Sequence, residues 1–93
     1  MKFRRKPLVV DAFQMTEENW RDNKFPQWFA KDFNEGFCQN YKYGAKYWGT
    51  ITTLYGDRKV AWNDYVVKGV NGELYPIKVD VFQRDYEKVE EEK

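Results

Sequence analysis

The chain has no histidine and no serine among its 93 residues, and it has a single cysteine, Cys38. It therefore lacks the most frequent general base and metal ligand of proteins, and it has no serine nucleophile. One thiol forms neither a disulfide within the chain nor a thiolate metal site. With no histidine to activate it, Cys38 is expected to be a buried, unreactive thiol. These absences argue against an enzyme, and no metal site or cofactor is expected.

Carboxylates remain as acid–base groups, but their positions favour structural roles. They lie at turns and at expected helix starts, where an Asp side chain bonds the neighbouring backbone. The acids in question are Asp57, Asp64, Glu73, Asp80 and Asp85. An enzyme that uses these carboxylates and Tyr is therefore the weakest of the functional hypotheses.

Net charge and long apolar runs are missing as well. Sixteen basic and fifteen acidic residues leave a formal charge of +1, so no long-range field favours nucleic acid or a membrane surface. No apolar run reaches the roughly 20 residues of a membrane-spanning helix. Asp11 interrupts the short apolar stretch after MKFRRK, unlike the apolar region of a signal peptide. We expect one cytoplasmic domain over residues 1–93, with residues 88–93 frayed.

Aromatic residues, in contrast, are abundant. Seven Tyr, seven Phe and four Trp make up 19% of the chain, which lets a small core bury a large area per residue. Not all of these rings fit one small core, and exposed rings beside Arg or Lys hold bases, nucleotides or peptides by stacking and cation–π contact. The alternatives are core packing for each ring and a solvated position for each cation. The candidates are Tyr41, Tyr43, Tyr47, Trp48, Arg58, Lys68 and Tyr75.

The first half of the chain predicts a strand and two short helices. Residues 7–14 are rich in β-formers. Thr16, which two acids follow, is typical of a helix N-cap. Residues 26–33 predict an amphipathic helix with an aromatic face, and Gly36 suits the left-handed residue that ends it. For residues 37–47 we expect a short strand and then a loop.

Two hairpins account for much of the second half. Gly56-Asp57 lies between two strand-like runs and predicts a two-residue turn that pairs Thr53 with Val60. Asn71-Gly72 is the strongest short hairpin signal in a sequence, and a two-residue turn there pairs Lys68 with Tyr75.

The remaining signals complete the expected architecture. Pro76 has no N–H to donate and belongs on an edge strand or at a bulge. Asp80 is expected to cap a last helical turn. The sum is an α+β fold: a small curled antiparallel sheet or open barrel of five to six strands, with one or two short helices.

Two segments follow the pattern of a known family. The chain opens with MKFRRKPLVVDAFQ, where that family has M-K-F-R-K-K-P-V-V-V-E-A-x-Q, and residues 62–82 read WNDYVVKGVNGELYPIKVDVF. The family's later motif is P-G-D-Y/W-I-I-K-G-x-x-G-E-F-Y-P-x-K-x-D-x-F. The chain thus resembles a group of short proteins encoded by bacteriophages and prophages. Trp62-Asn63 replaces the usual Pro-Gly, and the aromatic middle of the chain has no counterpart.

The resemblance implies a small phage accessory protein in the cytoplasm of a bacterial host, with no enzyme activity assigned to its family. It indicates no target. Most matching residues suit turns and caps. Glu73, Tyr75 and Lys78 are harder to explain by the fold alone, so they join the candidate binding residues.

Residues and resemblance together predict a non-catalytic accessory binding protein that counters host defence. It would either sequester a nucleotide-like signal, in a pocket at the interface of a homo-oligomer, or mask a host protein through an exposed aromatic surface. A small nucleic-acid-binding module that uses the N-terminal cations is the alternative. No membrane partner is expected. The predicted site residues are Tyr43, Tyr47, Trp48, Arg58, Lys68, Glu73, Tyr75 and Lys78.

Overall fold

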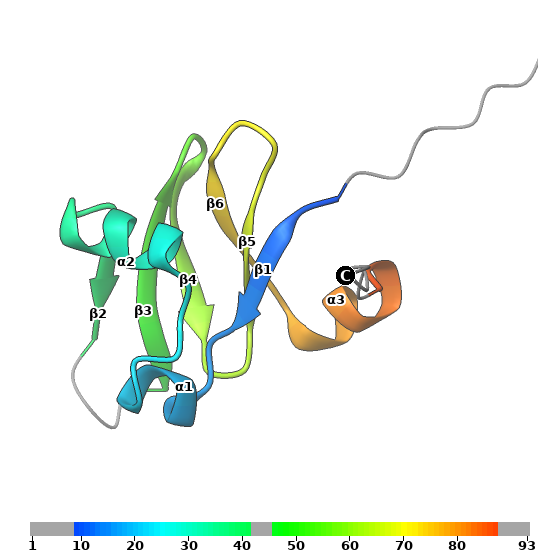
Figure 1. Ribbon diagram of the computed structural model, residues 1–93, viewed down its shortest axis with the longest axis horizontal. Helices are drawn as coiled ribbons and strands as arrows, with labels where there is room; N and C mark the ends of the chain where they lie inside the picture. The colour runs from blue at the N-terminus through cyan, green and yellow to red at the C-terminus, as the bar shows by residue number, and fades with distance from the viewer. Residues whose placement is uncertain (1–8, 42–45, 88–93) are drawn as a thin grey trace, which may run out of the picture.

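A computed structural model describes residues 9–41 and 46–87 of the protein (Figure 1). The elements are β1 (Asp11–Gln14), α1 (Glu17–Arg21), α2 (Gln27–Asn34), β2 (Cys38–Asn40), β3 (Tyr47–Thr53), β4 (Gly56–Ala61), β5 (Tyr65–Lys68), β6 (Leu74–Ile77) and α3 (Val79–Asp85). Tyr43, the N-terminal cations and the expected frayed tail, residues 88–93, lie outside the described residues.

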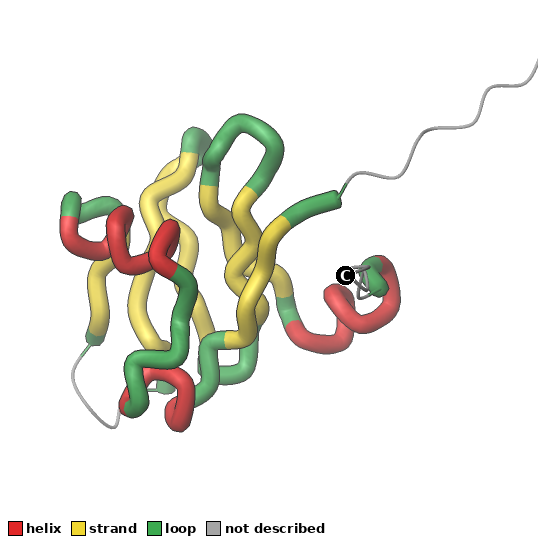
Figure 2. Tube along the Cα trace, viewed as in Figure 1, coloured by secondary structure: helices red, strands yellow, loops and turns green. Residues whose placement is uncertain are grey.

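The six strands form two antiparallel sheets of three strands each, in the orders β1-β5-β6 and β2-β3-β4 (Figure 2). The α+β class and the strand number are confirmed. The strands divide between two sheets, however, and the sheets do not close into a barrel. The described part of the chain also has three helices rather than one or two. Strand β6 lies beside β3 and β4, so the two sheets meet along β6.

The short helices begin and end where the local sequence predicts. The Thr16 hydroxyl accepts a hydrogen bond from the Asn19 N–H at 3.0 Å and caps α1. Helix α2 begins directly after Pro26, and Gly36 ends its C-terminal turn with a φ of 90°, which glycine adopts without strain. Asp80 does not cap α3, because it lies in the first turn and Lys78 takes the N-cap position.

A cluster of aromatic rings fills the space between the helices and the sheets. Phe29 of α2 contacts Phe13 of β1, with ring centroids 4.9 Å apart, and also Trp48 of β3, at 5.4 Å. Trp20 of α1 meets Trp48 edge-on at 5.3 Å. Edge-to-face pairs of this kind add to the stability gained from buried area. Helices α1 and α2 thus cover one face of both sheets.

Trp48, predicted as a binding residue, instead lies fully inside this core. The cause is a bulge: Tyr47 pairs with Ala61 and Gly49 with Val60, so Trp48 has no partner on β4. An extra residue of this kind re-aims its side chain, here into the core. The Trp48 indole N–H finds no hydrogen-bond acceptor among the described residues. The position is therefore structural, and Trp48 is removed from the candidate site.

Helix α3 covers the opposite face of the β1-β5-β6 sheet. Tyr65 stacks on Phe82 with centroids 3.8 Å apart, and Phe82 stacks on Tyr86 at 4.7 Å. Tyr65 points away from the side chain of its neighbour Val66, which belongs to the main core. The β1-β5-β6 sheet therefore has helices on both faces.

Both predicted hairpin registers are wrong, by different amounts. In the first hairpin Thr53 pairs with Gly56 and Ile51 with Arg58, so the turn is Leu54-Tyr55 and not Gly56-Asp57. Gly56 follows the turn with a φ of 102°, a conformation that favours glycine. Because each predicted partner is displaced by four residues, an even number, the side chains keep their predicted faces.

The second register differs by one residue, which exchanges the faces. Lys68 pairs with Leu74, and Val67 pairs with Tyr75. The loop has three residues, 70–72: the Gly69 carbonyl accepts from the Gly72 N–H at 3.0 Å, and Gly72 has a φ of 85°. This is a turn followed by a left-handed glycine, the second commonest solution for a hairpin. Pro76 is on β6, an edge strand of its sheet, as predicted.

Cys38 lies in the core, 3% exposed, as the sequence predicted. Burial raises the pKa of its thiol from 9.0 to about 12, and the negative charge of Asp32 adds to the shift. Only the thiolate attacks a disulfide reagent, so this pKa keeps the native thiol in its inert form.

We therefore expect Cys38 to react with an aromatic disulfide reagent at pH 8 about 1,000-fold more slowly in the native protein than in urea. The factor follows from the rise of the pKa from 9.0 to about 12, because each step of one in pKa lowers the thiolate fraction about tenfold at pH 8. Stopped-flow absorbance measures both rates. A native rate within tenfold of the unfolded rate would show that the thiol is accessible and not buried.

Candidate functional site

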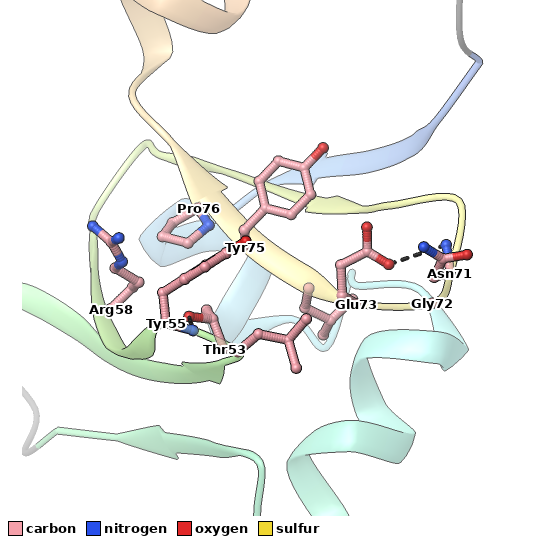
Figure 3. Close-up of a pocket in the computed structure, with 10 residues that line it drawn as sticks. Thr53, Tyr55, Arg58, Asn71, Gly72, Glu73, Tyr75 and Pro76 are labelled. Carbon is pink, nitrogen blue, oxygen red and sulfur yellow. Dashed lines mark hydrogen bonds between the residues drawn. The ribbon is translucent and has the colours of Figure 1, made fainter.

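An open hollow lies between the turns of the two hairpins, beside the edge strand β6 (Figure 3). Its volume is about 830 Å³, within the range of ligand-binding clefts. It is lined by Thr53, Leu54, Tyr55, Arg58, Asn71, Gly72, Glu73, Leu74, Tyr75 and Pro76. One wall thus comes from the β3–β4 hairpin and the other from the β5–β6 loop and β6.

Arg58 is the cation of this hollow. It lies on β4, exposed, and its guanidinium has no ion pair or hydrogen bond with any residue that the structure describes. In Figure 3 it lies on the Pro76 side of the hollow, away from the Glu73 carboxylate. Five N–H donors in a planar fork make a free guanidinium well suited to a carboxylate or phosphate.

Glu73 is the carboxylate of the hollow, and it has a structural task. One of its oxygens accepts a hydrogen bond from the Asn71 N–H at 3.0 Å. A Cβ added at Gly69 would overlap the Glu73 carboxylate. The side chain therefore folds back over Gly69 and holds the loop, which the sequence did not reveal.

Tyr75 lines the hollow and also faces α3. Burial raises the pKa of its hydroxyl to about 12, and a hydrogen bond with Tyr86 contributes. The phenol thus stays neutral over the physiological range. Its ring is half-buried between the hollow and the C-terminal helix.

Exposed apolar side chains gather at this end of the molecule. Leu54 is 87% exposed and Tyr55 86%, both in the β3–β4 turn, and Val70 in the β5–β6 loop is 66% exposed. Val9 precedes β1, which begins opposite the end of β5. Phe37 precedes β2 and its carbonyl accepts from the Thr52 N–H, next to the turn. Both hairpins turn, and both β1 and β2 begin, at the end drawn uppermost in Figure 1. We call Val9, Phe37, Leu54, Tyr55 and Val70 the hairpin end; they are the large hydrophobic side chains that the described structure exposes.

The structure brings together three of the predicted site residues: Arg58, Glu73 and Tyr75. The others lie elsewhere. Tyr47 lies outside the hollow, with the Lys59 ammonium 5.2 Å from its ring centroid. Lys68 is half-buried near Asp32, and Lys78 precedes α3 near Asp64.

Sequence reasoning missed Leu54 and Tyr55 because it placed them inside a strand. A turn usually takes Gly, Asn, Asp, Ser or Pro, so two large apolar residues there have no conformational reason. These unusual turn residues were the available signal, but they can be recognised as turn residues only once the register of the hairpin is known.

Asp57, Asp64 and Asp85 accept hydrogen bonds from neighbouring side chains or backbone. The Asp64 carboxylate accepts from the Ala61 N–H at 2.9 Å and closes the turn before β5. Burial raises the pKa of Asp64, although this backbone bond opposes the shift. No group of three or more potential metal-ligating side chains occurs within residues 9–41 and 46–87. No helix in that part of the chain is long and apolar enough to cross a membrane.

Comparison with known proteins adds no relative: no protein-family model, curated protein or solved structure matches the chain. The functional argument therefore depends on the geometry of the hairpin end and the hollow.

The contact of the Glu73 carboxylate with Gly69 and the Asn71 N–H can be tested by its effect on stability. Gly69→Ala displaces the Glu73 carboxylate, and Glu73→Ala deletes it, so each loses the bond to the Asn71 N–H. Each variant should lower the free energy of unfolding by about 1 kcal/mol. The double variant should cost about the same as either single one, because one bond cannot be lost twice.

Urea denaturation followed by circular dichroism measures these values. Asn71→Ala is the matched control: it keeps the backbone N–H and should leave stability nearly unchanged. Costs that simply add in the double variant would show that Glu73 and Gly69 act independently, contrary to this geometry.

Proposed function

We propose that the protein is a non-catalytic accessory binding protein that docks a partner protein with its hairpin end. The observation that carries the proposal is the position of three exposed apolar side chains: Leu54 and Tyr55 line the hollow, and Val70 belongs to the β5–β6 loop that forms its other wall. Scattered exposed hydrophobics are normal, but their concentration at one place marks interaction surfaces.

The chemistry of the hollow supports binding more than catalysis. Among the described residues its lining supplies one carboxylate, that of Glu73, and that group accepts a hydrogen bond from the loop backbone. A general acid–base pair would need a second titrating group within reach of the same substrate. Tyr55 and Arg58 are of the residue types enriched in binding hot spots, and Leu54, Leu74 and Pro76 add apolar lining among the described residues.

The biological setting follows from the resemblance to phage proteins. In that setting the partner is a protein of the bacterial host, in its cytoplasm, and the effect of docking is to mask it and so to counter host defence. A protein that acts by masking needs no turnover, which suits a chain without histidine or serine.

A nucleotide-like small molecule is the second candidate ligand, because Arg58 and Tyr55 line the same hollow. A base would stack on the Tyr55 ring and a phosphate would pair with Arg58. The dispersal of Tyr47, Lys68 and Lys78 weakens this alternative, since Arg58 is then the one cation among the described residues that line the hollow. A melting temperature raised by a nucleotide in wild type, and not in Arg58→Gln, would favour it. Nucleic-acid binding would use the N-terminal cations and is tested by salt-dependent binding of single-stranded DNA or RNA.

Site-specific photocrosslinking in bacterial cells tests the docking proposal. A benzoylphenylalanine in place of Tyr55 or of Val70 should yield the same protein adduct, because the two positions flank one hollow. The matched control is Glu18, exposed on α1, which should yield none.

A charge in the apolar surface should then abolish docking. Leu54→Asp should weaken the adduct formed from position 70 by about 30-fold, the effect of losing an interface hot spot. Its free energy of unfolding should stay within about 0.5 kcal/mol of wild type, because the side chain is exposed. Equal crosslinking from positions 18, 55 and 70, or none from the hairpin end, would contradict the proposal.

A further inference from the structure

The β5–β6 loop contains the one Asn-Gly step of the sequence, Asn71-Gly72. Asparagine is a chemically labile residue, most of all before glycine. The next backbone nitrogen attacks the side-chain amide, and glycine has no Cβ to hinder that attack. Both residues are exposed and line the hollow. A reactive pair that docking does not use therefore lies in the wall of the proposed site.

The side-chain amide of Asn71 is free to react. It makes no hydrogen bond with any residue that the structure describes. The side-chain amides of Asn19 and Asn40, in contrast, donate to backbone carbonyls at 2.9 and 2.8 Å. In Figure 3 Asn71 lies at the end of the loop, and a hydrogen bond joins it to the Glu73 carboxylate. That bond uses the backbone N–H of Asn71 and leaves its side chain unbound.

Two hydrogen bonds hold the backbone of this loop in place. The Gly72 N–H donates to the Gly69 carbonyl at 3.0 Å, and the Asn71 N–H donates to the Glu73 carboxylate at 3.0 Å. Before it can attack, the Gly72 nitrogen must leave the Gly69 carbonyl and lose its proton. Reaction therefore requires a local opening of the loop, which the Glu73 carboxylate opposes.

We propose that Asn71 is a site of spontaneous deamidation, and that the Glu73 carboxylate sets the rate by holding the loop closed. The Gly72 nitrogen gives its proton to water or hydroxide and forms a bond to the Asn71 Cγ. The Cγ–Nδ2 bond then breaks, and the side-chain nitrogen takes a proton from water and leaves as ammonia. Water opens the resulting succinimide at either carbonyl carbon, which yields aspartate or isoaspartate at position 71.

Either product changes the charge of the hollow. Each adds one carboxylate, so the formal charge of the chain falls from +1 to zero. Among the described residues that line the hollow, the charges of Arg58 and Glu73 cancel, and the new carboxylate makes the lining acidic. Isoaspartate also adds one atom to the main chain of the loop. The inference goes beyond the docking function, because the reaction needs no partner.

Incubation of the full-length protein at pH 8 and 37 °C, followed by tryptic peptide mapping, tests the site. Deamidation replaces an NH2 group by OH, and chromatography separates the isoaspartate peptide from the aspartate peptide. We expect native wild type to form isoaspartate at position 71, several-fold more slowly than the same chain in urea. Asn34 is the internal control and should stay intact, because the N–H of the next residue, Glu35, is bonded to the Lys31 carbonyl.

Three variants test the role of Glu73. Native Glu73→Ala should deamidate about fivefold faster than wild type, the change in loop population expected for the loss of one hydrogen bond. Glu73→Gln keeps an acceptor oxygen and should react close to the wild-type rate. Thr16→Ala removes the cap of α1 at a similar cost in stability, far from the loop in sequence, and should leave the rate unchanged. In urea all four chains should react equally fast.

The site would be refuted by native protein that holds no isoaspartate at position 71 after many half-times of the reaction in urea. Equal native rates for wild type and Glu73→Ala would refute the control by Glu73. Equal acceleration by Thr16→Ala and Glu73→Ala would assign the rate to global unfolding and overturn that control as well. The photocrosslinking result at positions 55 and 70 tests docking separately from all of these outcomes.

Discussion

Phe29 contacts rings from both sheets, Phe13 on β1 and Trp48 on β3, and this contact connects two sheets that share no hydrogen-bonded strand. Backbone ladders fix each sheet internally but not their relative position. That position depends on side-chain packing between the helices and both sheets, to which Trp20 and Trp28 also contribute. A small domain buries a modest fraction of its surface, so large aromatic rings are an efficient way to hold the two sheets together.

The hollow is a consequence of this packing between the two sheets. One wall belongs to the β2-β3-β4 sheet through Arg58 and the Leu54-Tyr55 turn, and the other belongs to β6 of the second sheet. Packing on one face of the molecule thus sets the distance between two hairpins at its end. The core rings and the exposed apolar residues have separate roles: the former hold the sheets, and the latter, at the hairpin end, are available to a partner. Preorganised walls of this kind lower the entropy lost on binding.

Local signals predicted local structure well, and the failures have physical causes. The Thr16 side chain caps α1, Gly36 adopts a positive φ, and Pro76 has no N–H to donate. Each effect depends on the residue itself, so the sequence predicted the place of each residue in the fold. Hairpin registers do not follow from single residues, because Asn71-Gly72 suits both a two-residue turn and a three-residue loop with the glycine last. Only the pairing of distant side chains selects between them.

The candidate site was predicted in part for the same reason. Arg58, Glu73 and Tyr75 meet in one hollow. Trp48 was assigned to the surface because no neighbouring residue type predicts the bulge that turns its side chain into the core.

The central claim is that aromatic packing between the two sheets fixes the two hairpins relative to each other. It is tested most directly by electron–electron distance measurement between spin labels at Leu54→Cys and Val70→Cys. The buried Cys38 thiol stays unlabelled. We predict one narrow distance distribution that broadens when Phe29→Ala is added; a broad or two-peaked distribution with the native core would contradict the account.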